Sequence, residues 1–127
     1  MEKTEYIKST LEVIETSILI VGEFVNFYID FAKGNVELHS AVNKIIQGYS
    51  YSIPVLPELL SGRPNSRNIK QDLLNSLEEL QIAFYLGDEY PEELRSSWTK
   101  FSKQWGNYVK LLRTVIENQR IMYIHLN

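Results

Sequence analysis

Apolar side chains recur every three or four residues along most of this chain, in four segments separated by stretches that contain glycine or proline. Over residues 3–33 the apolar positions are spaced 4-3-4-3-4-3, which is the period of an amphipathic helix with a nearly heptad seam. These positions are Ile7, Leu11, Ile14, Ile18, Val21, Val25 and Tyr28. Gly34 suits the left-handed residue that often ends a helix, and Asn35 suits the N-cap of the next.

The second segment carries two prolines inside its apolar pattern. Its apolar positions are Leu38, Val42, Ile45, Tyr49, Leu56 and Leu60. Because an interior proline lacks the backbone donor and clashes with the preceding turn, a helix cannot run evenly through Pro54 and Pro57. We therefore expect a helix to about Tyr49, a kink or break over 50–53, and a short helix that continues through Leu60.

The third and fourth segments, 67–86 and 91–125, are also predicted to be helices. Asn65 or Ser66 is the expected N-cap of the third, and Pro91 suits the first position of the fourth. The seam of the third segment is Ile69, Leu73, Leu77, Leu80 and Phe84, with Leu74 and Ile82 beside it. The seam of the fourth is Leu94, Trp98, Phe101, Trp105, Tyr108, Leu112 and Val115. Trp105 is expected at the centre of the core.

Four amphipathic segments joined by short loops predict an all-α fold, an antiparallel four-helix bundle with the second helix kinked or broken at Pro54 and Pro57. No segment alternates polar and apolar residues next to a hairpin turn, so no strand is expected. With 127 residues and 44% hydrophobic residues, the chain suffices for one core. Residues 1–127 are thus expected to form a single helical-bundle domain.

The first segment carries a second apolar stripe besides its seam. The stripe comprises Val13, Ile20, Phe24, Phe27 and Phe31. Counting 100° per residue, it lies ~110–120° around the helix from the seam, and the two together cover roughly 200°. One neighbouring helix covers only about half of that arc. Either the broken second helix folds over the stripe, or the stripe is the interface with another protein or with a second copy of the chain in a homodimer.

Charge divides unevenly along a chain whose net charge is −3. Residues 1–33 and 34–90 each carry a net −3, whereas residues 91–127 carry +3. Four basic residues lie on the polar side of the last helix: Lys103, Lys110, Arg113 and Arg120. They are too sparse for a nucleic-acid surface, so an acidic protein surface is the partner expected for this basic face.

The location of the protein is predicted from what the sequence lacks. It contains no cysteine, which weakly favours the cytoplasm. No apolar run approaches the ~20 residues that span a bilayer, and the first residues lack the pattern of a secretory signal. We therefore expect a cytoplasmic protein that does not cross a membrane.

The residue patterns of the common enzyme classes are missing from the sequence. The two histidines, His39 and His125, are not preceded by the Glu-x-x-His spacing of a di-metal bundle. Nucleophile-elbow and phosphate-loop motifs are also missing. Arg120 and His125 have the Arg-x4-His spacing that resembles the motif of HEPN ribonucleases, but Ile121 stands where that family usually has a polar residue. His39 is expected to be a solvated residue of a first helical turn.

These observations favour a non-enzymatic protein–protein interaction module, such as an adaptor, a small chaperone or an immunity-type protein. No catalytic, cofactor-binding or metal-binding residue is assigned. The alternative is a bundle that binds an apolar small molecule beside the aromatic residues Trp98, Phe101, Trp105 and Tyr108, since bundle interiors do host ligands. A helical nuclease or nucleic-acid binder is the less favoured third reading.

Overall fold

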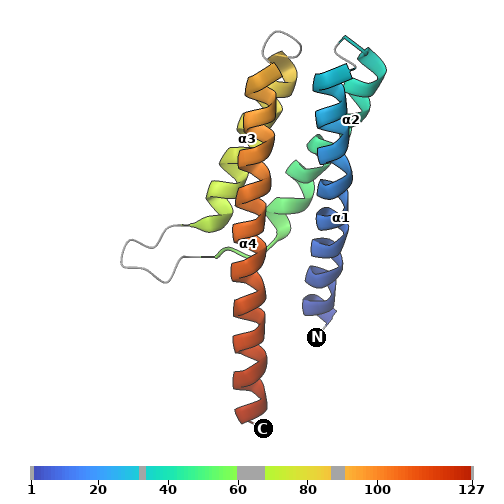
Figure 1. Ribbon diagram of the computed structural model, residues 1–127. Helices are drawn as coiled ribbons and strands as arrows, with labels where there is room; N and C mark the ends of the chain where they lie inside the picture. The colour runs from blue at the N-terminus through green and yellow to red at the C-terminus, as the bar shows by residue number, and fades with distance from the viewer. Residues whose placement is uncertain (1, 32–33, 60–67, 87–90, 127) are drawn as a thin grey trace.

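The computed structural model describes residues 2–31, 34–59, 68–86 and 91–126 (Figure 1), and their side chains over 5–31, 34–59, 68–85 and 91–117. Its elements are α1 (Glu2–Phe31), α2 (Val36–Ser52), the short 3₁₀ helix η1 (Ile53–Val55), α3 (Ile69–Leu86) and α4 (Pro91–Leu126). Successive α-helices run in opposite directions (Figure 1). The predicted all-α antiparallel four-helix bundle is confirmed, and the described residues contain no β-strand.

Each helix packs on two neighbours around the bundle. α1 lies against α2 and α4, and α3 lies against the same two helices, most extensively against α4. α4 continues beyond the N-terminal end of α1 (Figure 1). This arrangement gives α1 two flanking grooves, one toward α2 and one toward α4, and leaves its outer surface uncovered.

The predicted seams form the core, with two exceptions. The α1 positions from Leu11 to Tyr28 are buried, as are those of α4 from Leu94 to Leu112, including Trp105 at 4% exposure. On α2, however, Ile45 is 40% exposed and Ile46 is fully buried. The inward residues of α2 are Val42, Ile46 and Tyr49, followed by Ile53 of η1, because α2 is rotated to contact both α1 and α3. On α3, Ile82 is also exposed rather than beside the core.

Local polar contacts define the starts of α2 and α3. Gly34 has a φ of 85°, which confirms the left-handed residue expected there. The side chain of Asn35 accepts a hydrogen bond from the Leu38 backbone N–H at 3.0 Å, so it caps α2 as predicted. α3 begins at Ile69, later than expected, and its cap is Asn68, which accepts from the Gln71 N–H at 3.1 Å. The predicted caps Asn65 and Ser66 lie outside the described residues.

The chain leaves α2 through η1 and then runs without helical structure to Leu59. The short helix expected to continue through Leu60 is therefore wrong over 56–59, and Leu60 itself lies outside the described residues. Side chains of α3 and α4 donate hydrogen bonds to backbone carbonyl groups of this connection. Lys70 Nζ donates to the Pro54 oxygen at 2.6 Å, and Tyr108 Oη donates to the Pro57 oxygen at 2.7 Å.

Candidate interaction surface

The five stripe residues of α1 are all exposed in the bundle. Val13 is 69% exposed, Phe27 52% and Phe31 79%, and Ile20 and Phe24 lie between 40% and 50%. The seam of the same helix faces inward, so the stripe lies on the outer surface, on the side next to α2. Neither α2 nor η1 folds over it as the first alternative required. Whether another protein covers the stripe stays a prediction.

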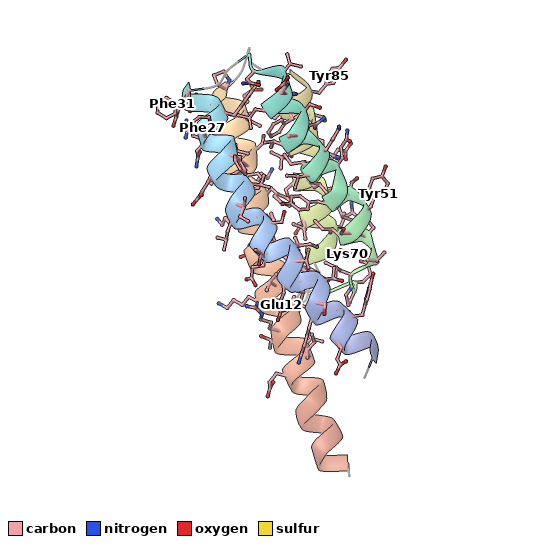
Figure 2. The ribbon with its side chains drawn as sticks, turned by 90° about the vertical axis from the view of Figure 1, so that its right-hand side faces the viewer. Glu12, Phe27, Phe31, Tyr51, Lys70 and Tyr85 are labelled. Carbon is pink, nitrogen blue, oxygen red and sulfur yellow. The ribbon has the colours of Figure 1, made fainter. Side chains whose placement is uncertain are left out.

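An open apolar hollow of about 500 Å³ lies where α1 and α2 adjoin. Val13 and Ile20 form its α1 side and Ile45 its α2 side, with Glu12 at its edge. Figure 2 shows α1 and α2 side by side on this face, with Glu12 on α1. The residue that the sequence assigned to the core, Ile45, thus belongs to this surface instead.

A second hollow, of about 360 Å³, continues the first toward the start of α1. Val13 lines both hollows, and Tyr6 of α1 and Tyr51 and Val55 of the α2–η1 segment line only the second. Together the two hollows form one groove, here called the α1–α2 groove. It follows α1 from Tyr6 to Ile20, which is about 21 Å of helix.

Gly48 lies on the α2 side of the groove, although it lines neither hollow. It stands three residues after Ile45 and four before Ser52, which line the first and second hollow respectively, so all three share one face of α2. A Cβ added at Gly48 would meet no atom within 4 Å. The sequence reasoning missed this residue, although the spacing Ile45–Gly48–Ser52 was available as a signal.

A hydrogen bond lies beneath the groove. The hydroxyl groups of Ser17 and Tyr49 are 2.6 Å apart, and they link α1 to α2. Burial raises the pKa of Tyr49 above its ordinary value of 10, and the bond with Ser17 offsets part of that effect. Tyr49 therefore stays a neutral phenol, so the groove has a polar but uncharged floor.

The far end of the stripe is aromatic. The rings of Phe27 and Phe31 are 5.6 Å apart at an angle of 44°. Both lie near the end of α1 that precedes α2 (Figure 2). Large aromatic side chains that are exposed and in contact with each other are typical of protein interfaces.

Carboxylate groups line the outer edge of the stripe. Glu5, Glu12 and Glu23 share one side of α1, are exposed, and make no ion pair in the described structure. Counting 100° per residue, this row lies about 90° from the apolar stripe. On α2 the exposed charges have both signs, with Glu37 in the first turn and Lys44 next to Ile45 in sequence.

Polar contacts join α1 to α4 on either side of the helix middle, and a hollow of about 330 Å³ lies between the two helices near the start of α1. Arg95 donates to Asp30 at 2.7 Å and to Asn26 at 3.0 Å, and Arg113 donates to Glu15 at 2.9 Å. These bonds tie α4 to the side of α1 that faces away from α2.

The predicted basic face is split by these contacts. Arg113 is engaged with Glu15, whereas Lys103 and Lys110 are exposed on the outer side of α4 without an ion pair among the described residues. The side chain of Arg120 lies outside the description. Of the three basic residues whose side chains the structure describes, two therefore lie on a free surface, Lys103 and Lys110.

His39 differs from its expectation. It is half-buried, and its Nε2 donates to the backbone oxygen of Phe84 at 2.7 Å. Its ring lies 5.6 Å from that of Tyr28 and 5.3 Å from that of Phe84. Carbonyl groups in the last turn of a helix lack a partner within that helix, so His39 serves as a structural cap that joins α2 to the end of α3. The side chain of His125 lies outside the description.

The aromatic residues of α4 are packed into the core. Trp98, Phe101, Trp105 and Tyr108 are all buried, with ring contacts between Trp98 and Phe101 at 5.8 Å and between Trp105 and Tyr108 at 6.2 Å. Within the described parts of the chain, the indole N–H of Trp105 has no hydrogen-bond partner. Among the described residues, no three His, Asp or Glu side chains are grouped so as to hold a metal ion.

Two findings place this surface in a wider context. Over the described part of the chain, the helices are too short or too polar to cross a membrane. Comparison with protein-family models, with curated proteins and with solved structures finds no match for this chain.

Proposed function

We propose that this protein is a non-enzymatic helical interaction module that binds another protein, or a second copy of itself, through the apolar side of α1. The observation that carries the proposal is the exposure of Val13, Ile20, Phe24, Phe27 and Phe31 along one side of a single helix. A continuous apolar surface of this kind is unusual on a monomer and usually marks an interface. An adaptor, a small chaperone or an immunity-type protein would use such a surface.

The neighbouring helix supports the proposal. Ile45 and Val55 extend the apolar surface beyond α1, and the α1–α2 groove gives it a concave shape that a helix or loop of a partner fits. The proposal places the protein in the cytoplasm, which agrees with a cysteine-free sequence.

The test compares substitutions on the stripe with a substitution elsewhere on the surface. Ile20→Glu and Phe27→Glu should leave the helical circular dichroism unchanged, because both side chains are at least half exposed. They should abolish capture of the partner by the tagged protein in lysate of the native host, or convert a dimer to a monomer of 14.8 kDa in sedimentation. Lys103→Glu on α4 is the matched control and should change neither result. Equal association by all three variants would refute the proposal.

A further inference from the structure

We infer that the α1–α2 groove binds an amphipathic helix of a partner whose apolar face is bordered on one side by Lys or Arg. This inference rests on the proposed function and specifies the partner of the same surface. It combines the shape of the groove with the charge along its edge.

The shape of the groove favours a helix. It follows α1 between Tyr6 and Ile20, a distance that matches a helix of about four turns. Val13 and Ile20 stand along α1 at a seven-residue spacing, and Ile45 faces them from α2. Side chains at i, i+3, i+4 and i+7 of a partner helix would fit between these residues as ridges fit into grooves. The missing side chain at Gly48 leaves room for one of them.

The charge along the groove favours a basic partner. Glu5, Glu12 and Glu23 are exposed without ion pairs in the described structure, and Glu12 lies at the edge of the first hollow. Glu12 also lines the hollow toward α4, together with Lys8 and Arg113, so it stands between the two hollows. Lys44 of α2 is the exposed cation nearest Ile45 in sequence. A helix seated in the groove would therefore place one of its flanks beside Glu12, with Glu5 and Glu23 on the same side of α1 just beyond the two ends of the groove. Complementary charge there would favour encounter and orientation.

The same charges argue against a second copy of the chain. Two α1 helices packed stripe to stripe would bring two rows of carboxylates to the borders of one interface. The free cations Lys103 and Lys110 lie on the outer side of α4, and over residues 91–117 no large apolar side chain is exposed beside them. The described surface around Lys103 and Lys110 is thus basic but not apolar, so it does not offer the stripe of another copy a matching face.

The experiment selects displayed peptides against the full chain. The library holds peptides of about five helical turns, with leucine fixed at i, i+3, i+4 and i+7 repeats and Lys, Glu, Gln or Ala at every other position. Recovered peptides should carry Lys along one flank of the leucine stripe. Their affinity, measured by fluorescence anisotropy, should fall as salt is raised because the flanking charges are screened.

Two matched pairs of variants locate the binding. Gly48→Leu should weaken the selected peptides by about tenfold or more because it fills the groove, whereas Gly106→Leu should not. Both glycines are helical and have open space above them, so both variants should fold. The double substitution Glu12→Lys with Glu23→Lys should reverse the selection toward peptides rich in Glu, whereas Glu78→Lys on α3 should not.

Three results would overturn the inference. Recovery of acidic peptides, or of none, would reject the basic helix. Equal binding to the Gly48→Leu variant would place the binding elsewhere. A native dimer that Gly48→Leu dissociates would show that a second copy occupies the groove, and the proposed interaction function would then stand without this partner. If, in addition, Ile20→Glu and Phe27→Glu alter no association, the proposed function fails as well.

Discussion

The two edges of α1 differ in the kind of side chain that they present to the neighbouring helix. Toward α4, the helix brings Glu15, Asn26 and Asp30 against the guanidinium groups of Arg113 and Arg95. Toward α2, it presents apolar side chains that nothing within the described structure covers. The polar edge finds ion-pair and hydrogen-bond partners within the chain, whereas the apolar edge leaves exposed an area that burial would stabilise. The contrast identifies the apolar edge as the surface available to a partner.

Gly22 on α1 and Gly48 on α2 show how closely each helix is approached by its surroundings. A Cβ at Gly22 would lie 3.1 Å from Nε1 of Trp98, because α1 and α4 approach closely there. A Cβ at Gly48, on the face of α2 that carries Ile45 and Ser52, would meet nothing within 4 Å. One glycine permits close packing of two helices, and the other leaves space on a surface.

The largest expected effect contrasts an aromatic residue of the core with one of the stripe. Trp105→Ala should lower the free energy of unfolding by about 3–5 kcal/mol, since it leaves a cavity in the core. Phe27→Ala should lower it by less than about 1 kcal/mol, because about half of that side chain is already in water. Urea denaturation of both variants measures the difference. A loss at Phe27 as large as that at Trp105 would show that the stripe is part of the core.

The glycine pair should give the next largest effect. Gly22→Ala should destabilise the fold by roughly 1 kcal/mol, because the clash with the buried Trp98 exceeds the gain in helix propensity. Gly48→Ala should stabilise it by about 0.5–1 kcal/mol, because only the propensity gain applies. Thermal unfolding by circular dichroism reports both signs. A destabilising Gly48→Ala would mean that the groove is already filled.

Removal of the polar contacts along α4 should have a smaller effect. Arg95→Ala should lower the free energy of unfolding by up to about 1 kcal/mol, because the pair with Asp30 is partly exposed to solvent. The loss should shrink in high salt, which screens exposed ion pairs. Denaturation of wild type and variant at low and high salt checks this. A loss independent of salt would indicate that packing of the Arg95 stem matters more than its charge.

The smallest effect concerns a paired carboxylate and an unpaired one. Hydrogen bonds from Asn68 and Lys70 hold the pKa of Glu58 below its ordinary value of 4.5. A lowered folded pKa contributes stability above the unfolded pKa and loses it as the pH falls through the folded pKa. Glu58→Gln should therefore flatten the decline in stability below about pH 4.5, whereas Glu12→Gln, which breaks no pair, should leave that decline unchanged. Denaturant titrations between neutral and acid pH compare the two variants, and identical curves would contradict the role of Glu58.

The stripe and the groove differ in how far the sequence could predict them. The five stripe residues follow from helical periodicity, since an arc of roughly 200° is too wide for one neighbour. Their exposure does not, because α2 could have packed over them. Ile45 was assigned to the wrong side because Ile45 and Ile46 are adjacent, and a rotation of about 100° exchanges them. Only the contacts of α2 with α1 and α3 fix that rotation.

His39 and Lys70 show a second limit of sequence reasoning. Both are polar residues near the start of a helix, which usually lie in water. In the structure His39 caps the end of α3, and Lys70 binds the carbonyl oxygen of Pro54. Their partners lie 45 and 16 residues away along the chain. No local pattern encodes such pairs, because they depend on which helix ends meet.

The sequence by itself determined the four helices, most of their ends, and the seams that face the core, because periodicity, glycine, proline and capping residues act over a few neighbouring residues. The tertiary structure decided which edge of α1 forms polar contacts with a neighbouring helix and which edge exposes its apolar side chains to solvent. That choice depends on the order of the helices around the bundle and on the rotation of each about its axis. Both are set by the simultaneous packing of side chains that are distant in sequence, such as Trp98 against Gly22 and Arg95 against Asp30.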